Sequence, residues 1–561
     1  MSRHEWITRG WPAVLVALVA TPAGAQSFRV QCPASTITHP NAAGNNAEPA
    51  YTAPTRFTCS VAGGCTPTNN VGYLVPVSNV NGALKCQQVS GGDGYATMAD
   101  GTQTFMFSFG PLSGLADISN GRPGTEFPAA FNTVAPGTLL PGDPATTDGA
   151  ADSPTYTGGS PAAFTYNGAV GLAPDADCIA ANAAALAAVP PQPPPCPNLA
   201  ANGLDGHVDP RPIMDVGVMN GNIPAPLMAI DEDDEYFLTL TNVGMIMRPD
   251  LFEQHTIHFH GYPNASSFYD GVPDASVAIN IGGSFTYYYL APDAGTYFWH
   301  CHITPPEHLQ MGMVGQLYVR PRQDRVPSGT SLYGALQAQQ GDPRTACNPA
   351  SDVLCSNSLP AVDTGAVGGG KYVYDDGDGS TAYDVEYPLQ IHGFDPNFHF
   401  VGMTFNPEAF VDMKDKYFLL NGRSYPDTVN PGPIATQSSD GRMHYSQPMP
   451  SIIDIPAGKR ALLRISDLSV TEYATLASLG VPMHVVGYNA KLLRDQGGNN
   501  MDYYANSITI GGGESLDVIL DASNTTLYPP GSVFYLYTSN LDHLSNDAEN
   551  FGGMMTEVRI N

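Results

Sequence analysis

The sequence predicts an all-β fold, on the basis of its composition, and two groups of strand-like segments that divide it into two β domains. Only 13% of its 561 residues are charged, whereas glycine and proline number 59 and 50. This composition is typical of an exported β protein with many turns. A chain of this length has room for two or three domains of ordinary size.

The first 25 residues have the pattern of a secretory signal peptide. Arg3 and Arg9 precede the apolar run 13–20, and the small residues 23–25 form a cleavage site. The apolar run is too short to cross a bilayer. We therefore expect an exported protein, periplasmic or extracellular, with no membrane partner. The net charge of −29 also argues against nucleic acid as a partner.

Nine cysteines fit an oxidising compartment, in which disulfides form. Four of them lie in residues 26–100, a polar segment that we expect to be a disulfide-bearing N-terminal extension. Eight cysteines can pair in four disulfides, and the sequence leaves their connectivity open. The ninth cysteine needs another explanation.

The first domain is expected at residues 101–322. Residues 100–110 alternate in the manner of a strand, and a long loop insert rich in Gly, Pro, Ala and Asp follows at about 111–210. The acidic run 231–235 is expected to be a solvated turn, with a cation site as the alternative. Further on, two strand-like segments flank a turn at 291–295. They are residues 284–289 and 295–299.

A linker is predicted at residues 323–371 and a second β domain at 372–561. The strand-like blocks of the second domain are residues 417–427, 452–467, 482–487 and 507–521.

The segment that follows the strand at 295–299 has the residues of a copper site. Cys301 lies between His300 and His302, and His308 and Met313 come after it. A thiolate, an imidazole and a thioether are ligands of a blue copper site, which is trigonal with a weak axial methionine. Copper ligation of Cys301 would also explain the odd cysteine.

A trigonal site needs a second histidine. The nearby histidine-rich stretch is 254–261, in which His255 is our candidate. The alternative is that these histidines are structural residues around a buried cysteine. The number and spacing of ligand-type residues in two blocks favour the metal site.

These two segments resemble the copper signatures of the multicopper oxidases, His-x-x-His-x-His-Gly and His-Cys-His-x-x-x-His-x-x-x-x-Met. The resemblance implies cupredoxin-like Greek-key sandwiches for both domains. The type-1 copper ligands that it implies are His255, Cys301, His308 and Met313. The ligands that it implies for a trinuclear type-2/type-3 copper cluster are His258, His260, His300 and His302. The pair Pro305-Pro306 lengthens the loop after His302 beyond the family spacing, which we interpret as an insertion within an intact site.

The resemblance also implies a copper-dependent oxidoreductase. A small donor, such as a phenol or a metal ion, would give single electrons to the type-1 copper, and dioxygen would be reduced at the cluster. Cys301, His300 and His302 would connect the two sites, so we predict them to be the catalytic residues.

The family cluster has eight histidines, and the first domain supplies four. The second domain has Thr538-Ser539-Asn540 where a copper-binding domain would have His-x-His, so we expect it to lack a copper site. Its histidines are expected to be structural or surface residues: His392, His399, His444, His484 and His543.

This deficit leaves three alternatives. The first is a two-domain oxidase that forms a homo-oligomer, such as a trimer, in which a neighbouring subunit completes the cluster. The second is an enzyme of the copper nitrite reductase type. The third is a non-catalytic blue copper electron carrier.

Overall fold

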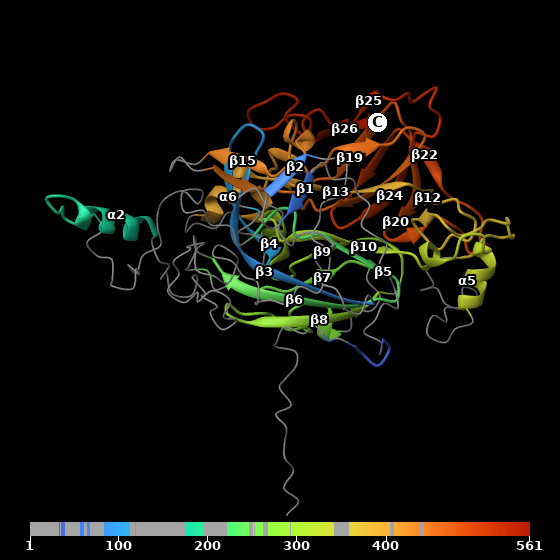
Figure 1. Ribbon diagram of the computed structural model, residues 1–561, viewed down its shortest axis with the longest axis horizontal. Coiled ribbons are helices and arrows are strands. Elements are labelled where there is room, and N and C mark those ends of the chain that lie inside the picture. Colours follow the sequence, from blue (N-terminus) through green and yellow to red (C-terminus); the bar gives the residue numbers. More distant parts are fainter. Residues whose placement is uncertain are drawn as a thin grey trace, which may run out of the picture.

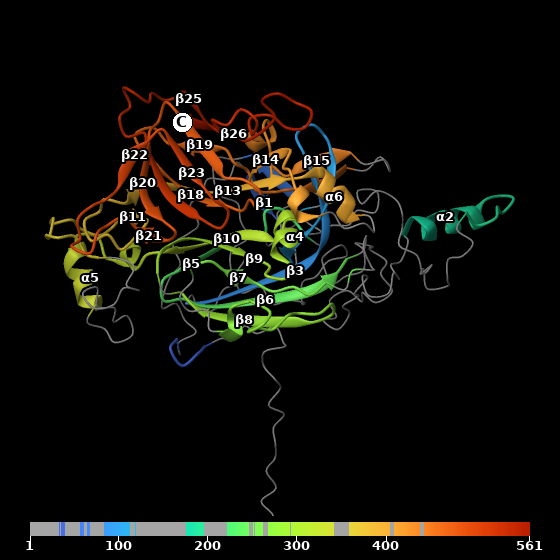
Figure 2. The same cartoon turned by 180° about the vertical axis from the view of Figure 1, so that it is seen from behind.

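Two β-sandwiches make up most of the structure, a computed structural model, so the predicted all-β fold class is confirmed. Figure 1 shows the first sandwich in green and blue beneath the second in orange and red, and Figure 2 shows the same arrangement from behind. The structure describes residues 33, 35–39, 57–60, 64–67, 83–112, 118, 176–195, 221–245, 251, 253–261, 267–291, 293–340, 358–403, 409–437 and 443–561. The expected signal peptide and most of the expected insert lie outside these residues.

The first sandwich consists of two four-stranded sheets. One has the order β4-β3-β6-β8, formed by Gln103–Pro111, Leu84–Thr97, Glu235–Gly244 and Ser284–Leu290. The other has the order β5-β10-β9-β7, formed by Met228–Asp231, Val314–Arg320, Gly295–His300 and His258–Phe259. Alternate residues of β8, such as Tyr287 and Tyr289, point into a core that also contains Cys301.

Strand β3 lies inside its sheet, between β4 and β6. It falls within residues 26–100, so this part of the segment is an integral strand and not part of an extension. The glycines of its Ser90–Gly94 stretch interrupt the apolar alternation, which is why the sequence pattern did not reveal the strand.

The second sandwich also has two sheets. The larger has the order β14-β13-β18-β24-β20-β21, with β22 paired to β20, formed by Tyr417–Leu420, Val385–Phe394, Arg460–Asp467, Ser515–Asp521, Met483–Tyr488, Lys491–Leu492 and Tyr503–Ala505. The smaller has the order β17-β26-β25-β19-β23, formed by Ile453–Ile455, Met555–Ile560, Val533–Tyr537, Ala474–Leu479 and Ser507–Ile510. Leucine, isoleucine and valine side chains fill the core between them.

The remaining elements are short. Three two-stranded sheets are β1-β2 (Phe57–Ser60, Gly64–Pro67), β11-β12 (Lys371–Tyr372, Ala382–Tyr383) and β15-β16 (Ile434–Gln437, Met443–Ser446). Among the described residues, the α-helices are α2 (Ala176–Ala187), α4 (Pro305–Gln310), α5 (Leu332–Gln340) and α6 (Pro396–Met403). The 3-10 helices are η4 (Ser267–Tyr269), η5 (Arg322–Arg325), η6 (Phe410–Asp412) and η7 (Asp427–Val429). Within the described part of the chain, no helix has the length and apolar character needed to cross a membrane.

The acidic run 231–235 is not a solvated turn, contrary to expectation. Four of its five side chains are buried, namely Asp231, Glu232, Asp234 and Glu235. The reason is that basic residues face it. Arg320 lies 2.8 Å from Asp231, Arg322 lies 2.9 Å from Asp233, and Lys85 lies 3.6 Å from Asp234. Buried carboxylates need such partners, and here the partners belong to other strands and turns.

Polar contacts join the two sandwiches next to β9. The Thr296 hydroxyl donates to Asp517 at 2.6 Å, and the Gln316 amide donates to the carbonyl of Arg464 at 2.9 Å. The Arg464 guanidinium is fully buried and pairs with Glu386 at 2.8 Å and Asp517 at 3.7 Å. These contacts place the end of β9, where Cys301 follows, against the second sandwich.

Candidate metal centre

Cys301 and two histidines form a first group of donor atoms. Cys301 is a free, fully buried cysteine directly after β9. Its Sγ lies 3.3 Å from Nδ1 of His308 and 4.0 Å from Nδ1 of His255. The backbone N–H of Thr256 points at the same sulfur, at 3.4 Å. The structure thus brings together residues 46 positions apart in the sequence.

Helix α4 carries His308 to this sulfur. Pro305 and Pro306 occupy its first turn, where a missing N–H costs nothing, and Thr304 before them has a left-handed φ of 38°. The two prolines that lengthen the loop therefore start a helix.

Met313 is fixed to this group through its backbone. Its N–H donates to the carbonyl of His308 at 2.8 Å, and its carbonyl accepts from the N–H of Cys301 at 3.1 Å. The Met313 side chain is fully buried in the same core cluster as Cys301.

The spacing of the first group fits a bound metal. Metal–sulfur and metal–nitrogen bonds of about 2.3 and 2.05 Å at trigonal angles put sulfur and nitrogen about 3.8 Å apart. The measured separations of 3.3 and 4.0 Å lie on either side of this value. A soft sulfur with two imidazole nitrogens is the donor set that copper prefers.

Burial and charge act on the two histidines in opposite directions. Burial, with the nearby His308 adding to it, holds the pKa of His255 well below its usual range. Burial also opposes the charged form of His308, but the Cys301 sulfur and the Glu253 carboxylate outweigh it and raise the pKa of His308 to about 9. Nε2 of His308 lies 3.6 Å from this carboxylate, which is partly exposed.

A second group consists of His258, His260 and His300. Their donor atoms lie within 4.8 Å of one another. Strand register creates this proximity, because His258 in β7 is paired directly with His300 in β9. His260 follows β7, and its Nε2 lies 3.0 Å from Nε2 of His300.

Each histidine of the second group forms a hydrogen bond from Nδ1 to a backbone carbonyl. The acceptors are the carbonyls of Asp270 at 2.7 Å, Gly513 at 3.1 Å and Cys301 at 2.7 Å, for His258, His260 and His300 respectively. A carbonyl only accepts, so Nδ1 is protonated in all three rings. Burial lowers the pKa values of His260 and His300, so Nε2 of these two rings keeps its lone pair. Two facing lone pairs at 3.0 Å repel unless a cation lies between them, which fits a metal bound at Nε2.

His302 lies beside this group without joining it. Its ring centroid is 5.0 Å from that of His258 and 5.4 Å from that of His300. Its donor atoms are not among those that converge within 4.8 Å.

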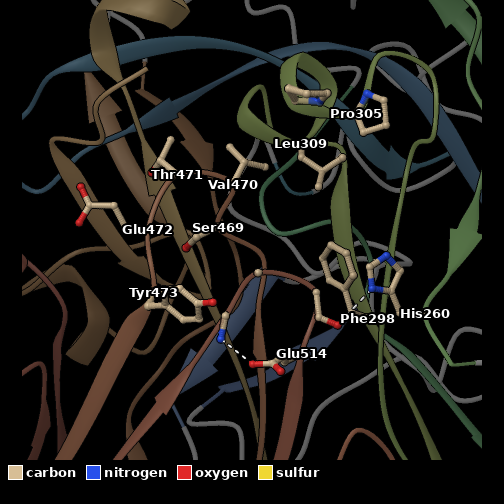
Figure 3. Close-up of a pocket in the computed structure, with 14 residues that line it drawn as sticks. His260, Phe298, Pro305, Leu309, Ser469, Val470, Thr471, Glu472, Tyr473 and Glu514 are labelled. Carbon is tan, nitrogen blue, oxygen red and sulfur yellow. Dashed lines mark hydrogen bonds between the residues drawn. The ribbon is translucent and has the colours of Figure 1, made fainter. Parts of the chain in front are cut away.

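A pocket of about 530 Å³ opens beside His260, at the junction of the two sandwiches. Figure 3 shows His260, Phe298, Pro305 and Leu309 on one side of it. Residues 469–473 and Glu514 of the second sandwich lie on the other side. Burial lowers the pKa of His260 to about 4, so this imidazole is neutral at physiological pH and its Nε2 is available to a metal.

The histidines of the second domain do not form a metal-binding group among the described residues. His484 pairs with Asp502 at 2.8 Å, and His543 pairs with Glu472 at 2.7 Å. His392 and His399 are fully buried and bond the backbone of α4.

Two glycines that approach predicted ligand histidines were not identified from the sequence. A Cβ on Gly91 would lie 2.7 Å from the His255 ring, and a Cβ on Gly513 would lie 2.7 Å from the His260 ring. The available signal was the clustering of glycine in strand-like or turn segments, which marks a close approach of the backbone.

Comparison with known proteins places these residues in a matched region. The family model described as multicopper oxidase matches residues 206–324, which contain all eight predicted ligands. The chain is 34% identical over 109 residues to laccase abr2 of Aspergillus fumigatus. It is 30% identical over 137 residues to the multicopper oxidase MCE of Talaromyces pinophilus, and 35% identical over 109 residues to a copper-containing nitrite reductase of Rhizobium meliloti.

These matches are partial. They cover 19%, 24% and 18% of this chain and 17%, 21% and 26% of the three relatives, in the order given. Among solved structures, the blue copper oxidase of Nitrosomonas europaea aligns with a TM-score of 0.40 and 22% identity, over 61% of this chain and 78% of that one.

Proposed function

We propose that this chain, whose residues 206–324 match the multicopper oxidase family model, is an exported copper-dependent oxidoreductase. In this proposal His255, Cys301, His308 and Met313 would hold a type-1 copper, which would supply the one-electron oxidation of a donor. The second histidine group would hold copper that supplies the reduction of dioxygen. The domain limits given above, with copper in the first domain only, are part of the proposal.

The observation that carries the proposal is the meeting of the Cys301 sulfur with two imidazole Nδ1 atoms, at 3.3 and 4.0 Å. A structural cysteine needs no such neighbours, since a buried thiol behaves as a small apolar group. Bound copper would supply reversible one-electron chemistry at this point.

The chain's own residues connect the two groups. His300 precedes Cys301 in the sequence, and Nδ1 of His300 donates to the carbonyl of Cys301 at 2.7 Å. The covalent backbone and this hydrogen bond therefore run from the sulfur of one group to an imidazole of the other. His302 continues the backbone on the other side of Cys301, and the proposal assigns it to the same cluster.

The proposed donor is a phenol or a metal ion that reaches the His308 side of the first group. Glu253 is the partly exposed carboxylate there, 3.6 Å from Nε2 of His308. It provides an acceptor for a phenolic hydroxyl and a charge for a cation. The proposed location is periplasmic or extracellular, and the missing cluster ligands would come from a homo-oligomer.

A nitrite reductase is the second candidate, and one observation favours it. The converging donors are those of His258, His260 and His300 alone, with His302 outside, which suits a single copper on three nitrogens. A non-catalytic blue copper carrier is the third candidate.

Copper content of the purified chain separates these candidates. About four coppers per chain are expected for the oxidase, about two for the nitrite reductase type and about one for the carrier. Oxygen uptake with a phenolic donor and nitrite consumption with a reduced dye are the accompanying activity measurements.

Replacement of the sulfur tests the type-1 site. The copper-loaded chain is expected to be blue, because a Cu(II)–thiolate absorbs strongly in the visible range, and Cys301→Ser should abolish this band. The variant should keep copper at the histidine group, measured by metal analysis. A visible band that survives the substitution would exclude Cys301 as a ligand.

A further inference from the structure

Two buried histidines of the second sandwich bond the helix that carries His308. His392 lies on β13, and its Nε2 donates to the carbonyl of Leu309 at 2.9 Å. His399 lies on α6, and its Nε2 is 2.9 Å from the carbonyl of Gln310. The two acceptors are consecutive carbonyls in the last turn of α4.

The same turn is held through a side chain. The Gln310 amide donates to Asp415 at 2.9 Å, and its oxygen accepts from the N–H of Asp395 at 3.0 Å. Gln310 is fully buried. All four contacts come from residues 392–415, in the second sandwich.

Helix α4 cannot hold this geometry alone. It has six residues, and Thr304 at its N-cap makes no side-chain hydrogen bond. A helix of this length is far below the length that is stable in isolation, because nucleation is costly. Its position therefore depends on what it packs against.

Leu309 and Gln310, at the end of α4, lie between His308 and Met313 in the sequence. The chain turns back directly after them, since Gly312 donates to the Leu309 carbonyl at 3.0 Å and Met313 donates to the His308 carbonyl at 2.8 Å. A shift of the Leu309 and Gln310 carbonyls would thus move both His308 and Met313 relative to Cys301.

Packing alone does not account for the two histidines. Leucine or phenylalanine would fill a core position without a buried polar atom, yet Nδ1 of His392 is buried with no hydrogen-bond partner. Phe394 fixes the rings, with centroids 4.8 Å from His392 and 4.2 Å from His399. Nε2 of each imidazole faces a carbonyl of α4, and Nδ1 of His399 also faces the carbonyl of Phe105 at 2.5 Å.

We propose that His392 and His399 are positioning residues that clamp the last turn of α4 and so hold His308 and Met313 at Cys301. This inference rests on the proposed type-1 site. It makes the second sandwich, which has no metal group among its described residues, a part of the metal centre's geometry.

The test uses leucine and glutamine variants of the full chain. His392→Leu and His399→Leu fill the space but remove the donor. His392→Gln and His399→Gln keep an amide donor near the place of Nε2. His484→Leu is the matched control, because His484 lies on β20 and pairs with Asp502, away from α4.

The first measurement is amide hydrogen exchange of residues 305–313 in the copper-free chain. Exchange should be at least about tenfold faster in the leucine variants, and close to wild type in the glutamine variants and in the control. Exchange of β24 should stay unchanged in all of them, which shows that the sandwich remains folded. Wild-type exchange of residues 305–313 in folded leucine variants would overturn the proposal.

The second measurement is made on the copper-loaded chain. The leucine variants should bind the type-1 copper about tenfold more weakly, with a changed visible band and a changed copper hyperfine splitting, as when supporting residues around a metal are lost. The glutamine variants should restore both signatures. A blue wild type whose band and splitting survive in both leucine variants overturns the clamp alone, whereas a wild type that binds copper without a blue band overturns the proposed function.

If the leucine variants do not fold, a third measurement on the wild type still tests the proposal. The clamp requires residues 311–313 to be as protected from exchange as β13, which carries His392. Rapid exchange of residues 311–313 while β13 is protected would overturn it.

Discussion

At the scale of single residues, two glycines leave the space that two of the predicted ligand histidines occupy. Gly513 has a φ of 88°, its carbonyl accepts from His260, and a Cβ there would lie 2.7 Å from the His260 ring. A Cβ on Gly91 would likewise lie 2.7 Å from the His255 ring. Neither glycine is a predicted ligand, but each leaves the space in which the ring of a predicted ligand lies.

Gly513→Ala should displace His260 and lower the copper bound at the histidine group, while the type-1 visible band remains. Gly531→Ala is the matched control, because Gly531 has a φ of 86° and open space at its Cβ position. Both variants carry the strain of a left-handed alanine, about 1 kcal/mol, and only the first adds a collision. Equal copper contents in the two variants, by metal analysis, would show that the Gly513 contact is irrelevant to the metal.

At the scale of elements, the strands and loops around two short segments determine the positions of those segments. Strand β7 has two residues, yet its pairing with β9 sets His258 opposite His300. Helix α4 has six residues, and its carbonyls are bonded by His392 and His399. These two histidines are also expected to make stability depend on pH.

Burial lowers the pKa of His392 to about 3 and that of His399 to about 4, although the carbonyl of Leu309 opposes the shift of His392, and the carbonyls of Phe105 and Gln310 with Asp395 oppose that of His399. The unfolded chain, with histidine pKa values near 6.5, binds more protons below that pH. Stability is therefore full above about pH 6.5 and falls as the pH drops toward 4 and 3. The loss at pH 5 is about 2 kcal/mol for each histidine.

Urea unfolding of the copper-free chain at pH 7 and pH 5 measures this loss. His392→Gln should show a decrease in unfolding free energy between the two pH values that is smaller than the wild-type decrease by about 2 kcal/mol. An equal decrease in both proteins would mean that His392 is not neutral in the folded chain at pH 5.

At the scale of the whole molecule, a buried ionic network joins the two sandwiches. Arg464 is fully buried between Glu386 and Asp517, and its guanidinium lies 4.4 Å from the ring centroid of Tyr318 in the first sandwich. Asp517 also accepts from Thr296 of β9 at 2.6 Å. Strand β9, which leads to Cys301, is thus held against the second sandwich by charged and polar contacts as well as by packing.

Arg464→Met should lower the unfolding free energy by about 3–5 kcal/mol, because it leaves two buried carboxylates without their cation. Arg559→Met is the control, since Arg559 pairs with Glu557 at 2.6 Å and is partly exposed. That variant should lose about 1 kcal/mol or less. Similar losses in the two variants, by denaturant unfolding, would contradict a structural role for the buried network.

The sequence by itself predicted the all-β class, the strands at 284–289 and 295–299, and the candidate metal ligands around Cys301. These features are local, because alternation and short spacing are visible within a few positions. Only the tertiary structure revealed β3 inside its sheet, the burial of the acidic run, the glycines behind His255 and His260, and the use of His392 and His399 against α4. Each of these depends on a partner far away in the chain, and a side chain's burial and hydrogen bonds are decided by that partner and not by its neighbours in sequence.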